Sequence, residues 1–112
     1  MYLPFFRDAV SAKRIAFGFT RITADNVMAA PERMFRDLAA VNPLSRLSSI
    51  MSPTLVVHAE LDPLPEAFSA LIADGIAGSD FVVLKGVNHF AYVEDPEPLF
   101  GVVRPFLRRR AK

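Results

Sequence analysis

Short apolar runs in the second half of the chain predict two β-strands. Residues 53–58 read Pro-Thr-Leu-Val-Val-His and residues 80–85 read Asp-Phe-Val-Val-Leu-Lys. Both runs are rich in β-branched side chains and lack polar alternation, which is typical of strands buried on both faces of a sheet. Because a helix lies between them, we expect the two strands to pair in parallel through a right-handed crossover.

Two amphipathic stretches predict the helices of this half. Residues 65–74 place their large apolar side chains on one helical face, and Gly75 is a suitable stop. Asp95 and Pro96 have the form of a helix cap followed by proline in the first helical position. The helix that they open carries apolar residues at spacings of three and four, and Pro105 is expected to bend its last turn.

The first half of the chain has a helical pattern that ends at Asn42-Pro43. Apolar residues recur at helical spacings over residues 5–16, and a second helical stretch begins near Asp25 or Pro31. Proline inside a helix removes a hydrogen bond and clashes with the preceding turn, so we expect Pro31 to break or restart that helix.

Together these elements predict an α/β fold, in which N-terminal helices precede a β-α-β-α unit with parallel strands. Two parallel strands alone rarely form a stable sheet, and strands that are apolar on both faces need cover on both. We therefore interpret the second half of the chain as the edge of a larger sheet.

Composition excludes several classes of function. The chain has 112 residues, 52% hydrophobic composition and a formal net charge of +1, so it has material for one core and no electrostatic reason to bind nucleic acid. The absence of cysteine excludes disulfides and suits a cytoplasmic location. The sequence shows neither a signal-peptide pattern nor an apolar run long enough for a membrane. The basic run at residues 108–112 is interpreted as a complement to a helix dipole.

Two loops that follow the predicted strands carry the candidate chemistry. Asp62 follows the first strand and His89 follows the second. In open parallel sheets, ligands bind outside the carboxyl ends of the strands. A carboxylate that accepts a hydrogen bond from one imidazole nitrogen fixes the tautomer, so that the other nitrogen acts as general base. We therefore expect Asp62 and His89 to lie at the same edge of the sheet, close enough to hydrogen-bond.

Each of these residues also has a structural interpretation. Asp62 precedes Pro63 and suits a turn, and a single histidine in an apolar loop is more often a buried structural residue than a catalyst. His58, Glu60 and Asp62 alternate, so a divalent metal held by this set and His89 is a further alternative. The turn expected at Glu60 disfavours the metal site, and we expect no metal or other cofactor.

Five segments of residues 50–107 follow one another in an order that is specific to one enzyme superfamily. They are a strand over residues 52–58, the loop Glu60-Leu61-Asp62-Pro63-Leu64-Pro65, a strand over residues 81–84, the loop Gly86-Val87-Asn88-His89-Phe90, and Val93-Glu94-Asp95-Pro96-Glu97 at the start of the last helix. In this order they resemble the C-terminal region of α/β-hydrolase enzymes. The resemblance implies ester or amide hydrolysis by a Ser-His-Asp triad. It assigns Asp62 as the acid and His89 as the base of that triad.

The same resemblance divides the chain into two regions. Residues 1–45 resemble part of a helical cap, and residues 46–112 resemble the C-terminal part of the catalytic domain. The cap and the phrase Asn88-His89-Phe90 are similar to those of proline iminopeptidase-like and related hydrolases. Phe90 and Tyr92 are expected to border a pocket for a small-molecule substrate.

The resemblance also implies a serine that this sequence does not supply. The family's nucleophile lies in a Gly-x-Ser-x-Gly turn, and no such motif occurs in the sequence. The oxyanion loop of the family is missing as well. Because loss of the nucleophile and the oxyanion donors removes orders of magnitude in rate, we expect the chain alone to be inactive.

Two functions of different classes follow. In the first, the chain is a fragment of a hydrolase, or one half of a split enzyme whose complementing chain supplies the serine. In the second, it is a non-catalytic interaction module that forms homo-oligomers through exposed strand edges and uncovered apolar faces.

Overall fold

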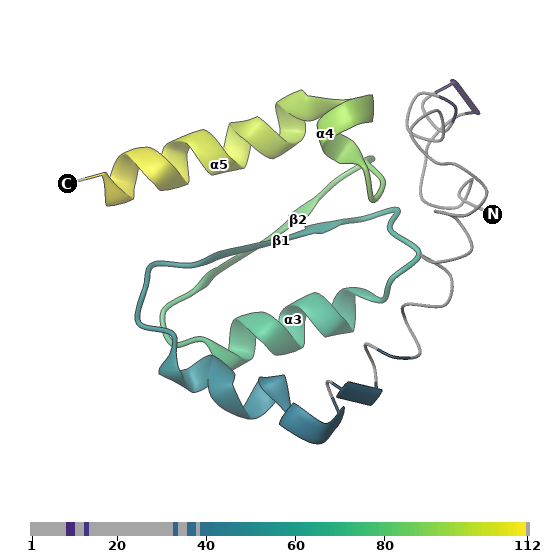
Figure 1. Ribbon diagram of the computed structural model, residues 1–112. Helices are drawn as coiled ribbons and strands as arrows, with labels where there is room; N and C mark the ends of the chain where they lie inside the picture. Colours follow the sequence, from purple (N-terminus) through teal and green to yellow (C-terminus); the bar gives the residue numbers. More distant parts are fainter. Residues whose placement is uncertain (1–8, 11–12, 14–32, 34–35, 38, 112) are drawn as a thin grey trace.

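The computed structural model describes residues 9, 10, 13, 33, 36, 37 and 39–111 (Figure 1). The described residues before Asn42 are helical. Most of the predicted cap region, residues 1–45, lies outside the described residues, as do most of the helical stretches predicted within it.

A parallel pair of strands lies at the centre of the described fold. β1 (Leu55–Ala59) pairs with β2 (Asp80–Leu84), and α3 (Glu66–Gly75) connects them. In the register of the pair, Leu55 lies opposite Asp80 and Ala59 lies opposite Leu84. Both predicted strands and their parallel pairing are confirmed, although β1 begins after Pro53, which has no amide to donate to a sheet.

Helices cover opposite faces of the strand pair (Figure 1). α3 packs against β1, and α5 (Pro96–Arg110) packs against β2. Side chains of successive strand residues point to opposite faces, so β1 contributes to both layers. The main core lies on one face and is formed by Ala59, Leu84, Val87 and Ala91, with Val57, Val82, Leu99 and Val102 packed around them.

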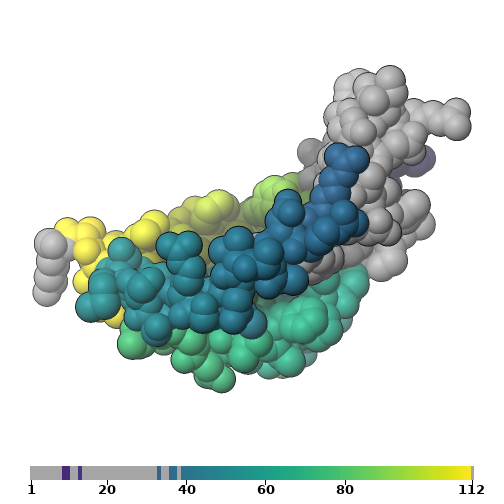
Figure 2. Space-filling view, turned by 60° about the horizontal axis from the view of Figure 1, so that its bottom comes forward, coloured from purple at the N-terminus to yellow at the C-terminus, as the bar shows by residue number. Residues whose placement is uncertain are grey.

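Two short helices were not predicted from the pattern. The 3-10 helix η2 (Pro43–Ser49) begins after Asn42, whose φ of 45° lies in the left-handed region. η2 packs against α3, and Figure 2 shows the two side by side on the near face of the molecule. α4 (Ala91–Glu94) lies between β2 and α5. Both helices are too short for an apolar period to develop.

The expected capping role of Asp95 is wrong in one respect. Asp95 occupies the position before α5, but its side chain makes no cap hydrogen bond. Its backbone amide instead donates to the Ala91 carbonyl at 2.9 Å and so ends α4. Pro96 removes one of the amides that a cap would otherwise serve. Asp95 therefore joins two consecutive helices rather than capping the second with its carboxylate.

Much apolar surface stays exposed in the described part of the fold. No large side chain described there is fully buried. On the outer side of α3, Phe68 and Leu71 are 61% and 50% exposed. Helices that are apolar around most of their circumference are normally covered by other elements. None of the described helices combines the length and the apolar character needed to cross a membrane.

Gly75 provides a test of the packing between η2 and α3. A Cβ atom at Gly75 would lie 2.7 Å from Cδ1 and 2.9 Å from Cβ of Leu47. We expect Gly75→Ala to cost about 1–3 kcal/mol through overpacking, against a gain of about 0.5–1 kcal/mol in helix propensity. Urea unfolding of the chain measures the net change.

Gly101→Ala in α5 is the matched control, because among the described residues, apart from its chain neighbours and the nearby backbone of its own helix, no atom lies within 4 Å of a Cβ added there. We expect this variant to show only the propensity gain. An equal gain in stability for both substitutions would contradict the contact between η2 and α3.

Candidate functional site

Asp62 lies in the loop that leaves β1. Its backbone amide donates to the Ala59 carbonyl at 3.0 Å, and the preceding residue, Leu61, donates to the Val87 carbonyl at 3.0 Å. The Oδ1 atom of Asp62 accepts the backbone amide of Leu64 at 2.9 Å. Aspartate commonly holds turns in this way, so the structural interpretation of Asp62 is confirmed. The second carboxylate oxygen, Oδ2, points to a different partner.

His89 lies in the loop between β2 and α4. Gly86 opens this loop with a φ of 68°, a left-handed conformation that favours glycine. Val87 and Asn88 are 4% and 6% exposed, so the residues just before His89 are anchored in the fold. Oδ1 of Asn88 accepts the backbone amide of His89 at 2.8 Å. The backbone of His89 is therefore held firmly, whereas its imidazole lies at the surface.

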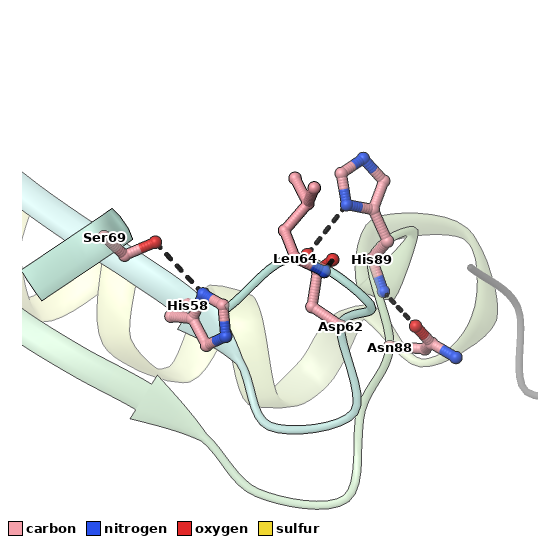
Figure 3. Close-up of polar contacts among 6 residues, drawn as sticks. All are labelled: His58, Asp62, Leu64, Ser69, Asn88 and His89. Atoms are coloured by element: carbon pink, nitrogen blue, oxygen red, sulfur yellow. Dashed lines mark hydrogen bonds and ion pairs between the residues drawn. The ribbon is translucent and has the colours of Figure 1, made fainter. Parts of the chain in front are cut away.

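The two loops bring Asp62 and His89 into direct contact. Nδ1 of His89 lies 2.7 Å from Oδ2 of Asp62, and the side chains are 35% and 11% exposed, respectively. An ionised carboxylate only accepts hydrogen bonds, so Nδ1 is the donor in this contact, and in a neutral imidazole Nε2 would then carry the lone pair. Figure 3 shows Nε2 on the side of the ring away from Asp62. The predicted proximity of the two residues is confirmed, and their catalytic role stays a prediction.

A hollow beside this pair is lined mainly by apolar side chains. It has a volume of about 210 Å³, and its lining residues are Val57, Ala59, Asp62, Leu84, His89, Ala91, Tyr92 and Leu99. Of the two predicted pocket residues, Tyr92 belongs to this lining. Phe90 instead packs its ring against the His89 ring, with centroids 4.9 Å apart, and against Tyr92 at 6.0 Å. Edge-on contacts of this kind restrict ring orientation.

His58 belongs to a different part of the molecule from the pair. It is 5% exposed, and its Nδ1 lies 3.0 Å from the Ser69 hydroxyl on α3. Figure 3 shows this contact separated from the pair of Asp62 and His89. Among the residues that the structure describes, no group of three potential ligands could hold a metal ion. The geometry therefore does not support the metal alternative for His58 and Glu60.

The Glu60 side chain makes two contacts that the sequence pattern does not predict. Its carboxylate accepts from Nζ of Lys85 at 2.8 Å and from the backbone amide of Gly86 at 2.8 Å. The Lys85 and Gly86 hydrogen bonds lower the pKa of Glu60 below its usual range. The hydrogen bond to Glu60 raises the pKa of Lys85. No sequence pattern predicts this contact, because it joins residues that follow two different strands and lie far apart in the sequence.

Four described serines bond to groups other than His89. The hydroxyls of Ser45, Ser49 and Ser79 donate to backbone carbonyls of Asn42, Arg46 and Ala73, and Ser69 bonds to His58. Side chain to backbone bonds are common structural uses of serine. The nucleophile expected from the resemblance is not assigned to any of the four.

A solved structure of an N-acyl homoserine lactone degrading enzyme is similar to part of this chain. The sequence identity is 41%, the TM-score is 0.53, and the similarity covers 56% of this chain and 25% of that chain. This chain therefore spans about a quarter of the length of that enzyme. No protein-family model and no curated protein matches the chain. The similarity supports a hydrolase-type relationship for the aligned part.

The Glu60 contacts predict a pH dependence of stability. Because the folded-state pKa of Glu60 is lowered, its contribution is present above the usual pKa of glutamate and is lost as pH falls through the folded value. Because the folded-state pKa of Lys85 is raised, the contribution of Lys85 to stability is lost only when pH rises through that raised pKa. The difference in unfolding free energy between the unaltered chain and Glu60→Gln, measured in urea, should therefore stay constant near neutrality and shrink in acid. A difference that does not change in acid would contradict this assignment.

Proposed function

We propose that this chain supplies the acid and the base of a serine hydrolase with an α/β-hydrolase fold. The observation that carries the proposal is the 2.7 Å contact between Nδ1 of His89 and Oδ2 of Asp62. The two residues follow adjacent parallel strands at their carboxyl ends, where ligands bind in open sheets of this kind. The similarity to an N-acyl homoserine lactone degrading enzyme supports the hydrolase class.

In the proposed reaction, Asp62 holds the imidazole of His89 with Nδ1 protonated. Nε2 accepts the proton of a serine hydroxyl as the serine oxygen attacks the carbonyl carbon of the substrate. Nε2 then gives this proton to the leaving alkoxide or amine. In the second half of the reaction, Nε2 of His89 takes a proton from water as the water oxygen attacks the acyl carbon. Nε2 then returns this proton to the serine oxygen as the acyl–oxygen bond breaks and the acid is released. Asp62 stays ionised and stabilises the imidazolium that forms twice per turnover.

The nucleophile and the oxyanion donors are proposed to come from a further polypeptide segment. The sequence holds no Gly-x-Ser-x-Gly motif, and the similar enzyme has about three quarters of its length outside the aligned part. The outer edge of β1 and the exposed side chains Phe68 and Leu71 offer surfaces for such a segment. The proposed substrates are esters, including lactones such as the one that the similar enzyme degrades.

A non-catalytic interaction module is the second candidate function. It is favoured by the absence of a fully buried large side chain among the described residues. The large apolar side chains therefore stay partly exposed, and exposed apolar patches mark places where another chain binds. In this alternative the contact between Asp62 and His89 is structural, and the exposed faces of the strand pair bind a partner or a second copy.

A hybrid enzyme separates the two candidate functions. Residues 46–112 replace the structurally aligned region of the N-acyl homoserine lactone degrading enzyme, and lactone hydrolysis is measured. We expect an active hybrid in which His89→Ala lowers kcat on the order of 10⁶-fold. Asp62→Asn should lower kcat about 10⁴-fold, because it favours the wrong imidazole tautomer. The isolated chain should show no hydrolysis.

Asp80→Asn is the matched control for the aspartate substitution. Asp80 lies at the opposite end of β2 and pairs with Arg109 at 3.2 Å, so its loss should leave kcat within about twofold, as for surface changes away from a site. A folded hybrid that is inactive, or one that keeps its rate with His89→Ala, would favour the interaction module.

A further inference from the structure

Glu60 joins the loop of the proposed acid to the loop of the proposed base. One carboxylate oxygen, Oε1, accepts from Nζ of Lys85 at 2.8 Å, and the other, Oε2, accepts from the backbone amide of Gly86 at 2.8 Å. The backbone amide of Glu60 donates to the Leu84 carbonyl, also at 2.8 Å. Both the backbone and the side chain of Glu60 therefore contact the end of β2.

These contacts lie directly beside the pair in both loops. Glu60 is separated from Asp62 by a single residue, Leu61, whose amide bonds to the Val87 carbonyl at 3.0 Å. Gly86 lies in the turn that leads to His89, and its φ of 68°, in the left-handed region, turns the backbone away from β2. The carboxylate of Glu60 thus bonds to the start of the loop that carries His89, while its backbone leads through Leu61 to Asp62.

The Glu60 contacts act mainly on the positions of the two loops and less on the free energy of unfolding. The side chains of Lys85 and Glu60 are 79% and 39% exposed, and exposed ion pairs contribute little to folding. The hydrogen bond from the Gly86 amide differs from this ion pair, because a hydrogen bond between a backbone amide and a carboxylate is directional and charge-assisted. It fixes a main-chain position, whereas the lysine ammonium on its flexible stem does not.

We propose that Glu60 is a positioning residue that sets the hydrogen bond between Asp62 and His89. Its consequence for turnover rests on the proposed hydrolase function, but the structural part of the proposal does not. A displacement of about 1 Å in a catalytic group can cost on the order of 10²-fold in rate. Glu60 does not contact the reacting atoms in this proposal and acts through the backbone of the two loops.

The structural part is tested by NMR on the full chain with ¹⁵N-labelled histidine. In the unaltered chain, the Nδ1 proton of His89 should give a downfield, slowly exchanging signal, with ¹⁵N shifts of the Nδ1-protonated tautomer. Glu60→Met keeps the aliphatic stem and removes both acceptors, so this signal should be lost. Glu60→Gln retains an oxygen for the Gly86 amide and should preserve the signal.

Lys85→Met is the matched control, because it removes the ion pair and leaves the Gly86 bond in place. It should keep the His89 signal. If Glu60→Met also keeps the signal while its backbone amides show a folded chain, the proposal is overturned. Loss of the signal in Lys85→Met as in Glu60→Met would overturn it as well, since the ion pair would then be the cause. If Glu60→Met does not fold, loss of the signal in folded Glu60→Ser decides the matter in the same way.

The hybrid enzyme tests the catalytic consequence. Glu60→Met should lower kcat about 10²-fold with little change in KM, and Glu60→Gln should restore most of the rate. An inactive unaltered hybrid with an intact His89 signal would refute the proposed function and leave the positioning role standing. An active hybrid whose kcat does not respond to Glu60→Met would refute the positioning role alone.

Discussion

The parallel register of β1 and β2 is the constraint on which the site depends. Ala59 lies opposite Leu84, so both strands end at the same level of the sheet. A parallel pair sends both following loops out of one edge, whereas an antiparallel pair would place them at opposite ends. The acid and base loops therefore start side by side. Without this register, two residues 27 positions apart in the sequence would have no reason to meet.

Hydrogen bonds beyond the strands turn this rough proximity into a defined geometry. Beyond the last strand residues, the two loops are joined by the hydrogen bond from the Leu61 amide to the Val87 carbonyl. Asp62 uses one carboxylate oxygen to hold its own turn and the other to contact His89. Each loop thus has local bonds that fix its backbone before the two side chains meet. Functional residues are often carried by loops that a rigid scaffold supports in this way.

The elements of this scaffold could be predicted from the sequence because their patterns are local. The β-branched runs, the amphipathic stretch before Gly75 and the Asp95-Pro96 helix start each report the structure of their own segment. The proximity of Asp62 and His89 also followed, since it needs only two parallel strands and the loops after them. The cap region assigned to residues 1–45 lies mostly outside the described residues and stays a prediction.

The missed features depend on contacts between segments that are distant in sequence. The turn at Glu60 could be predicted, but its side-chain partners could not, because nothing near it in the chain indicates Lys85 and Gly86. η2 was missed since its fit against α3 depends on Leu47 and Gly75. Asp95 looked like a cap from its own sequence, but the end of α4 uses its backbone. Tertiary contacts decided each of these positions, and local propensity did not.

The central claim is that Asp62 and His89 act as one acid–base unit in hydrolysis. A double-mutant cycle in the hybrid enzyme tests it most directly, with kcat measured for Asp62→Asn, for His89→Ala and for the double variant. Residues that act as a unit are strongly non-additive. The account predicts that the double variant is no slower than His89→Ala alone. Losses that multiply would show two independent contributions and would contradict it.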